Sequence, residues 1–175
     1  MKVKVKAKTK WLWRAIAAMA ATLALSNFLV QFPIGDWLTW GAFSYPAVFL
    51  VTDLSNRFGG AAFARRVVYA GFAAGVLISI ATSSLRIAAA SGSAFLCAQL
   101  LDVLIFHRLR RSTWWRAPVI SSAAASITDT FLFFALAFYN TGGPWATWAA
   151  GDLLAKAVML AVLIVPYRAA IRRYA

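Results

Sequence analysis

The sequence predicts an all-α integral membrane protein with six transmembrane helices. Of its 175 residues, 62% are hydrophobic and 13% are charged, whereas a soluble domain carries about 25% charged residues. Because one membrane-spanning helix needs about 20 apolar residues, six of them use about 120 residues. The remainder suffices only for short connections, so we expect a single transmembrane domain over residues 1–175.

The apolar stretches are separated by turn-forming or basic segments, which set the limits of each predicted helix. Segments 32–36 and 140–144 contain proline and glycine and are typical of turns. Segments 57–66 and 107–116 are basic. Pro46 lies inside the second stretch, where we expect a kink because its nitrogen cannot donate a backbone hydrogen bond. The predicted helices cover residues 11–31, 39–57, 67–84, 87–106, 117–139 and 145–166.

The basic residues indicate the orientation in the membrane. Sixteen of the eighteen lysines and arginines lie in the N-terminal arm, in segments 57–66 and 108–116, and in the C-terminal tail. With six spans these regions share one side, and the other side has only Arg86. Cytoplasmic loops carry such an excess of positive charge, so we expect both termini in the cytoplasm. Since these residues lie at span ends, the +13 net charge indicates contact with the lipid bilayer and not with nucleic acid.

Four of the five carboxylates in the chain lie inside the apolar stretches. They are Asp53, Asp102, Asp129 and Asp152, and the sixth stretch also contains Lys156. A charged side chain at membrane depth is costly, so it usually faces a cavity, a partner charge or a substrate path. We therefore expect the acidic side chains to converge from different helices on a shared polar site with room for a ligand.

Helical spacing places some of these residues on common faces. Asp53 and Arg57 are four residues apart, as are Asp152 and Lys156, and residues four apart are neighbours on a helix. Each pair either neutralises its own charge within one helix or contributes to the shared site, and the sequence leaves both interpretations open. Asp129 has no charged partner one turn away.

Other chemistry is poorly supported by the sequence. Cys97 is the only cysteine, which excludes a disulfide framework within the chain, and we expect neither a metal nor a cofactor. No zinc-protease or phosphate-loop motif occurs. The glycines of Gly71-x-x-x-Gly75 let helices approach closely, either within the fold or between two copies of a homodimer.

One segment resembles a known family. Asp53-Leu54-Ser55-Asn56-Arg57-Phe58-Gly59, followed by Ala64-Arg65-Arg66, is similar to the most distinctive segment of the queuosine precursor transporter family, also called the vitamin uptake transporter family. Where many members have a glutamate, this chain has Asn56, so no role is carried over for an acidic group there. Further matches follow in the family's order: Asn27, Ala90-Ser91, Gln99, Asp102, Ser126, Asp129, Thr130, Phe133, Lys156 and Pro166.

The resemblance implies a multi-pass carrier of the bacterial inner membrane. Such a carrier imports 7-cyano-7-deazaguanine or a related 7-deazaguanine, from which queuosine in transfer RNA is made. The resemblance also implies a fold similar to the substrate-binding subunits of energy-coupling-factor vitamin transporters, and no enzymatic activity. Two alternatives stay open: a binding subunit that needs an ATP-driven module, and an intramembrane enzyme, for which no pairing of a nucleophile with a base is evident.

The polar residues suit a guanine-like ligand. Its edge presents a ring N–H and an amine, which one carboxylate can accept, and a carbonyl, which a lysine or an amide can bind. We expect a substrate site near the membrane midplane, formed by Asp129, Lys156, Gln99, Asn27, Asp102, Asp152 and Phe133. We expect a cytoplasmic-side polar network, which opens and closes, formed by Asp53, Asn56, Arg57 and Asp102.

Overall fold

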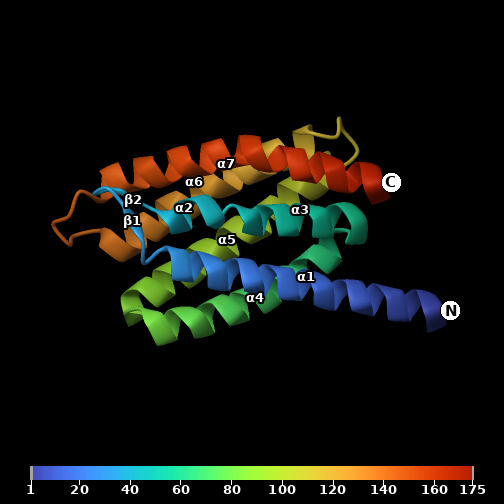
Figure 1. Cartoon of the computed structure of the whole chain (residues 1–175), viewed down its shortest axis with the longest axis horizontal. Coiled ribbons are helices and arrows are strands. Elements are labelled where there is room, and N and C mark those ends of the chain that lie inside the picture. Colours follow the sequence, from blue (N-terminus) through green and yellow to red (C-terminus); the bar gives the residue numbers. More distant parts are fainter. Residues whose placement is uncertain (1, 175) are drawn as a thin grey trace.

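The computed structural model describes residues 2–174, which are almost entirely helical (Figure 1). In chain order the elements are α1 (Lys2–Leu29), β1 (Pro33–Ile34), β2 (Leu38–Thr39), α2 (Trp40–Ser44), α3 (Ala47–Gly59), α4 (Ala61–Thr82), α5 (Leu85–Leu109), α6 (Arg116–Phe138) and α7 (Trp145–Tyr174). Within this part of the chain, five helices are long and apolar enough to cross a membrane, namely α1, α4, α5, α6 and α7. The class predicted from the sequence, an all-α membrane protein, is therefore correct.

The second predicted span, 39–57, is divided into two helices. The helix α2 ends at Ser44 and α3 begins at Ala47, with Tyr45 and Pro46 forming a turn between them. The expected kink is thus a full break, because Pro46 cannot donate to the preceding turn and instead precedes α3 as its capping residue. Neither helix alone is long enough to be a span, but together they cover 20 residues and lie end to end in Figure 1.

The helices extend past the predicted apolar limits at their basic ends. The basic segment 57–66, expected as a loop, is helical except at Gly60. Gly60 has a φ of +83°, which glycine adopts without strain, and this single residue separates α3 from α4. Apolar residues mark only the part of a helix that lies in hydrocarbon, whereas the backbone hydrogen bonding continues into the polar boundary.

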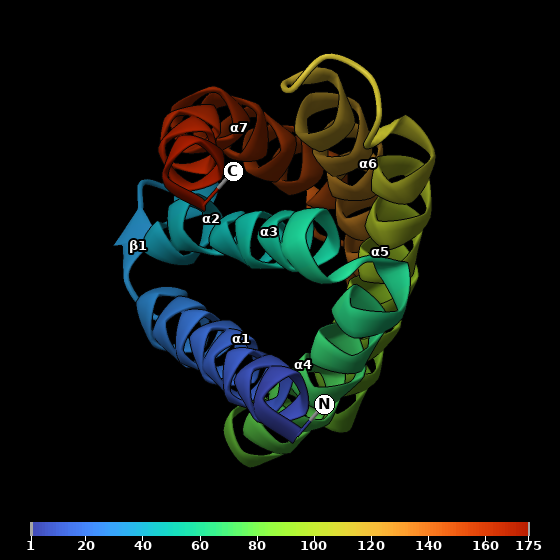
Figure 2. The ribbon, with the colours of Figure 1, turned by 90° about the vertical axis from the view of Figure 1, so that its right-hand side faces the viewer.

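The helix α3 occupies the centre of the assembly. It contacts α1, α4, α5, α6 and α7, and the end-on view places it inside the ring of longer helices (Figure 2). Its polar side chains are therefore buried by the surrounding helices, with Thr52, Asp53, Ser55 and Asn56 each at most 2% exposed. The outer helices instead present large apolar side chains, including Leu77 and Val165, to the surroundings.

The small-residue motif of α4 is used within the chain. A Cβ atom on Gly71 would lie 2.6 Å from Met19 Cγ of α1, and one on Gly75 would lie 3.7 Å from Leu23 Cδ1. The two glycines therefore allow α1 and α4 to approach closely. A homodimer would have to use a different surface.

The two ends of the molecule differ in their elements. The strands β1 and β2 form a hairpin that pairs Pro33 with Thr39 and joins α1 to α2. This hairpin lies at one end, together with the α6–α7 connection, whereas the N- and C-termini both lie at the opposite end (Figure 1).

Candidate functional site

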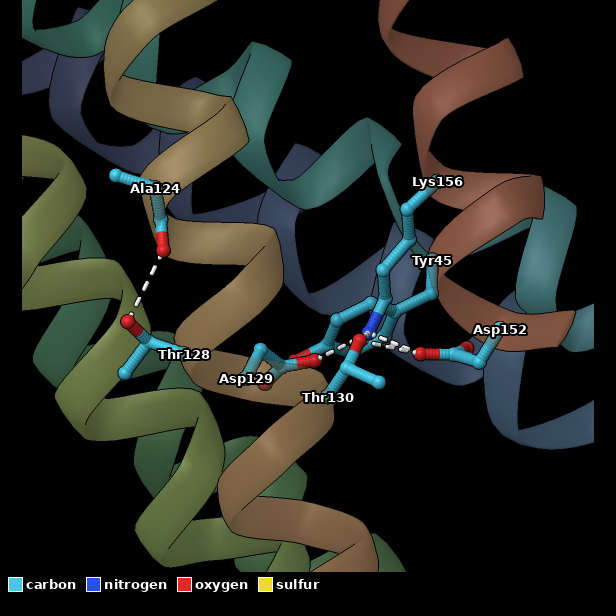
Figure 3. A network of polar contacts seen from close by, with 7 residues as sticks. All are labelled: Tyr45, Ala124, Thr128, Asp129, Thr130, Asp152 and Lys156. Atoms are coloured by element: carbon cyan, nitrogen blue, oxygen red, sulfur yellow. Dashed lines mark hydrogen bonds and ion pairs between the residues drawn. The ribbon is translucent and has the colours of Figure 1, made fainter. Parts of the chain in front are cut away.

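A buried polar cluster centres on the ammonium group of Lys156 (Figure 3). Its Nζ atom lies 2.7 Å from Asp129 Oδ2 and 2.6 Å from Asp152 Oδ2. It also donates a 2.9 Å hydrogen bond to Thr130 Oγ1, and that hydroxyl donates to Asp152 Oδ2 at 2.7 Å. All three N–H donors of the lysine therefore have an acceptor, and Lys156 is only 3% exposed.

The helix break at Pro46 supplies the next member of the cluster. Tyr45, in the turn between α2 and α3, donates its hydroxyl to Asp129 Oδ1 over 3.1 Å. Its ring also lies under the ammonium group, with Lys156 Nζ 5.3 Å from the ring centroid. The cluster thus joins three separate regions of the chain: the α2–α3 turn, α6 and α7.

The cluster carries an excess of negative charge when its groups are ionised. Asp129 and Asp152 share the one ammonium of Lys156, which leaves a formal charge of −1. Such a site offers carboxylate acceptors to N–H donors and an ammonium donor to a carbonyl. A few placed polar groups in an apolar wall are typical of small-molecule sites.

The hollow beside the cluster is small in this conformation. A cavity of about 20 Å³ lies between α3, α6 and α7 and reaches from Lys156 to Asp53 and Tyr167. A water molecule fits such a volume, but a bicyclic base does not. The carboxylates of α6 and α7 converge on Lys156, but Asp53 and Asp102 do not join them, and the expected room for a ligand is closed.

A second polar cluster, formed by side chains of α3, α5 and α6, lies closer than the Lys156 cluster to the end of the molecule where the two termini lie. Asp53 of α3 accepts hydrogen bonds from Ser121 Oγ at 3.3 Å and Ser122 Oγ at 3.2 Å, both on α6. Its carboxyl group also interacts electrostatically with that of Asp102 on α5. Both oxygens of Asp102 lack a hydrogen-bond partner among the described residues, as does the hydroxyl of Tyr167.

The amide side chains lie beside this second cluster and not beside Lys156. Gln99 accepts a 2.5 Å hydrogen bond from Thr52 Oγ1, and Asn56 donates to the carbonyl of Val103 over 2.9 Å. Both amides are fully buried. They tie α3 to α5, so the structure places Gln99 with Asn56 in the predicted network and not in the Lys156 cluster.

Arg57 does not form an ion pair with Asp53, although their spacing on one helix face allowed one. Arg57 Nη1 instead donates to the carbonyl of Arg110 over 2.6 Å, and Arg110 Nη2 donates to the carbonyl of Arg57 over 2.8 Å. These reciprocal bonds hold the end of α3 against the α5–α6 connection. Both residues line a surface hollow of about 640 Å³ together with His107, Arg108 and Arg111.

The other two predicted site residues lie apart from the Lys156 cluster. The amide of Asn27 donates to the carbonyl of Leu23 in its own helix, over 3.0 Å. The ring of Phe133 packs edge-on against Phe134 and Phe138, with centroids 5.1 and 6.0 Å away. Phe133 is nevertheless one turn from Asp129 on α6, so this aromatic group lies along the same helix as the cluster.

Two groups of polar side chains in these clusters were not predicted as site residues. The only sequence signal for Tyr45 as a member of the cluster is its neighbour Pro46. A proline can break a helix, and the residue at the break then directs its side chain differently from a residue inside a continuous helix. Thr130, Ser121 and Ser122 belong to a helix rich in small residues, where a hydroxyl signals only packing. In the described part of the chain, no group of three or more histidine, cysteine or carboxylate side chains is arranged to hold a metal ion.

Comparison with known proteins identifies the family. A family model described as "Putative vitamin uptake transporter" matches residues 39–83 and 77–171, which is most of the chain. The chain belongs to the vitamin uptake transporter family. It is accordingly a multi-pass protein of the bacterial inner membrane, as its apolar helices also indicate.

Three curated relatives support this assignment. The chain is 38% identical to the queuosine precursor transporter of Escherichia coli K12, over 81% of this chain and 77% of the relative. It is 34% identical to a protein of Haemophilus influenzae Rd named probable queuosine precursor transporter, over 82% and 79%. A Bacillus subtilis 168 protein of the same name is 30% identical over 73% and 67%. No solved structure matches the chain.

Proposed function

We propose that this protein carries a queuosine precursor, 7-cyano-7-deazaguanine or a related 7-deazaguanine, into the cell across the inner membrane. The observation that carries the proposal is the buried cluster of Asp129, Asp152 and Lys156, which joins α6 and α7 deep in an apolar wall. Charged groups at this depth are costly and usually belong to a transport path. The names of the three relatives support the same substrate class.

The chemistry of the cluster matches the edge of a 7-deazaguanine. Asp129 or Asp152 accepts the ring N–H and the exocyclic amine, and Lys156 donates to the ring carbonyl. A neutral base then replaces part of the present ion-pair network without adding charge to the interior. The aromatic rings on α6, including Phe133, offer a stacking surface one turn away.

Substrate binding in this proposal requires the helices to separate. The present hollow of about 20 Å³ is lined by Pro46 and Asp53 of the α2–α3 region on one side and by Lys156 and Tyr167 of α7 on the other. A movement of α3 away from α6 and α7 enlarges it. The polar network of Asp53, Asp102 and Asn56, with Arg57 at the helix end, then opens towards the cytoplasm.

The proposed orientation has six crossings and both termini in the cytoplasm. The helices α2 and α3 together cover 20 residues, which at 1.5 Å per residue is about 30 Å, the thickness of the hydrocarbon layer. The common placement of the termini in Figure 1 supports an even number of crossings. The excess of arginines at that end supports its cytoplasmic location.

Uptake by cells tests the function and the site together. The host lacks its own precursor synthesis, its own importer and any energy-coupling-factor module, and it receives external 7-cyano-7-deazaguanine. We expect expression of the chain to restore queuosine in transfer RNA, measured by mass spectrometry of tRNA nucleosides. Asp129→Asn and Lys156→Ala are expected to abolish this at equal membrane levels, whereas the exposed Asp36→Asn serves as a matched control.

The same experiment separates the rival functions. Failure of the unsubstituted chain to restore queuosine would contradict an independent carrier, and restoration only after an ATP-driven module is added would make the chain a binding subunit. Normal uptake by both Asp129→Asn and Lys156→Ala would remove the Lys156 cluster from the substrate site. Conversion of the base by the purified protein would indicate an enzyme.

A further inference from the structure

Two buried carboxylates, Asp53 and Asp102, lie next to each other without a cationic partner. Asp53 on α3 is 2% exposed and Asp102 on α5 is fully buried. The two carboxyl groups interact electrostatically, and neither forms an ion pair within the part of the chain that the structure describes. Asp53 accepts from Ser121 and Ser122, whereas neither oxygen of Asp102 has a hydrogen-bond partner in the described part of the chain.

The cations packed around this pair are engaged elsewhere. Arg57, one turn along α3, and Arg110, from the α5–α6 connection, donate to each other's backbone carbonyls. Lys156 on α7 is held by Asp129 and Asp152. From α6, the uncharged hydroxyls of Ser121 and Ser122 donate to Asp53.

A second orphaned polar group points to the same place. The hydroxyl of Tyr167 on α7 has no hydrogen-bond partner among the described residues, although Tyr167 is only 1% exposed. Tyr167 interacts electrostatically with Asp53, and both line the cavity that reaches Lys156. Asp53 and Tyr167 thus line a water-sized space, and the unpartnered oxygens of Asp102 belong to the carboxyl group that interacts with Asp53.

Two adjacent ionised carboxylates without a counter-ion are strongly unfavourable in a dry interior. Like charges at such a site raise the cost further, and carboxylate pairs elsewhere avoid it by sharing one proton. A proton on one oxygen removes one negative charge and creates an O–H donor for the neighbouring carboxylate. It therefore satisfies the charge and the missing hydrogen bond together.

We propose that Asp53 and Asp102 form a proton-binding site that exchanges its proton with the cytoplasm as the carrier moves its substrate. An O–H bond forms on one carboxyl oxygen when a proton arrives from the outer side through the cavity, and this bond breaks when α3 opens and the proton passes to cytoplasmic water. The coupling of proton release to substrate transport rests on the proposed function, whereas the binding of a proton by Asp53 and Asp102 does not. The ligand of this site is a proton, and Na⁺ is an alternative that the test separates.

Infrared spectroscopy tests the bound proton without any substrate. The purified protein in lipid at neutral pH is expected to show the C=O band of a protonated carboxyl group, which moves on labelling with ¹³C-aspartate. Because the chain has five aspartates and no glutamate, this label covers every carboxyl side chain. We expect Asp102→Asn and Asp53→Asn to lose the band, and the exposed Asp36→Asn to retain it.

Either of two infrared results would overturn the proposal. One is the absence of the band from the unsubstituted protein, which requires no variant to fold. The other is its persistence in both Asp102→Asn and Asp53→Asn, which would locate the proton elsewhere. A band that appears only when Na⁺ is removed would assign the site to Na⁺ and contradict a resident proton.

Proteoliposomes test the coupling to transport. With one proton moved per substrate, an inward gradient of one pH unit supports up to about tenfold accumulation of labelled 7-cyano-7-deazaguanine. We expect this ratio to fall to about one when an uncoupler is added, and in Asp102→Asn. Asp36→Asn is expected to keep the full ratio.

The outcomes distinguish the two proposals. Uptake that only equilibrates, or that follows a Na⁺ gradient, contradicts proton coupling and leaves the carrier function intact. Absence of uptake under every gradient contradicts the carrier function, and the infrared band then decides the proton site alone.

Discussion

At the scale of single residues, Lys156 balances two carboxylates, so its removal has a structural as well as a functional effect. Taking away one partner of a buried ion pair leaves an uncompensated charge and costs about 3–5 kcal/mol, whereas replacing all members by neutral groups is often tolerated. The same residues therefore have to be changed singly and together before a loss of uptake is assigned to the site.

We predict that Lys156→Met lowers the melting temperature in detergent and abolishes uptake. The triple variant Asp129→Asn, Asp152→Asn and Lys156→Met is expected to regain most of the thermal stability, because no buried charge is left unpaired, but not the uptake. Thermal unfolding and the transfer-RNA assay measure the two effects separately. Uptake by the triple variant would show that the cluster only holds the helices together.

Tyr45 combines a hydrogen bond to Asp129 with a ring contact to Lys156, and two substitutions separate these contributions. Tyr45→Phe keeps the ring and removes a hydrogen bond to a charged group, which is typically about 1.5 kcal/mol, or about tenfold in KM. Tyr45→Leu also removes the cation–π contact and is expected to raise KM further and lower the melting temperature. A KM for Tyr45→Phe equal to that of the unsubstituted protein would contradict a role in orienting Asp129.

The residue scale also shows where sequence reasoning succeeds and where it stops. Asp129, Asp152 and Lys156 are recognisable because charge inside an apolar stretch needs a partner. Asn27 was expected in the same site, but its amide finds a carbonyl within its own helix. An amide, unlike a charge, can be satisfied locally, so its position in a span does not predict its partner.

At the scale of elements, the ends of α3 are held in different ways. Its start is fixed by the break at Pro46, and its end by the reciprocal bonds between Arg57 and Arg110. The spacing of Asp53 and Arg57 suggested an ion pair within α3. Arg57 lies at the end of α3, however, where its guanidinium group reaches a neutral backbone carbonyl outside the buried core. Helical spacing identifies neighbours on one helix and carries no information on those competing acceptors.

We predict that Arg57→Ala slows transport more than it weakens substrate binding, because it frees the end of α3 without touching the Lys156 cluster. Arg110→Ala removes the other half of the same connection and is expected to have the same effect. The double variant is then expected to behave like either single variant. Initial uptake rates and binding by isothermal calorimetry measure the two quantities.

Arg111→Ala is the matched control for these variants, since Arg111 is exposed in the same connection. It is expected to leave rate and affinity unchanged. Additive losses in the Arg57→Ala and Arg110→Ala double variant, or an equal loss of binding and rate, would contradict a shared role in holding α3.

At the scale of the whole molecule, the apolar stretches predict most of the helices but not their connections in space. Five stretches correspond to long helices, because hydrocarbon imposes a minimum length on any helix that crosses it. The central position of α3 could not be predicted, because its sequence is no more apolar than those of its neighbours. Its polar face is buried only through its contacts with all five long helices. That burial is what makes Asp53 and Asn56 inaccessible to solvent.

The six-crossing orientation gives the last prediction. In a Cys97→Ala background, Thr141→Cys lies in the α6–α7 connection and Ser112→Cys in the α5–α6 connection, and both positions are exposed. A membrane-impermeant maleimide added to intact spheroplasts is expected to label Thr141→Cys, and to label Ser112→Cys only after the membrane is permeabilised. If α2 and α3 do not cross the membrane together, the arginines of the α5–α6 connection lie outside, and Ser112→Cys reacts in intact spheroplasts. That result would leave five crossings, place the termini on opposite sides, and separate the proposed cytoplasmic network from the cytoplasm.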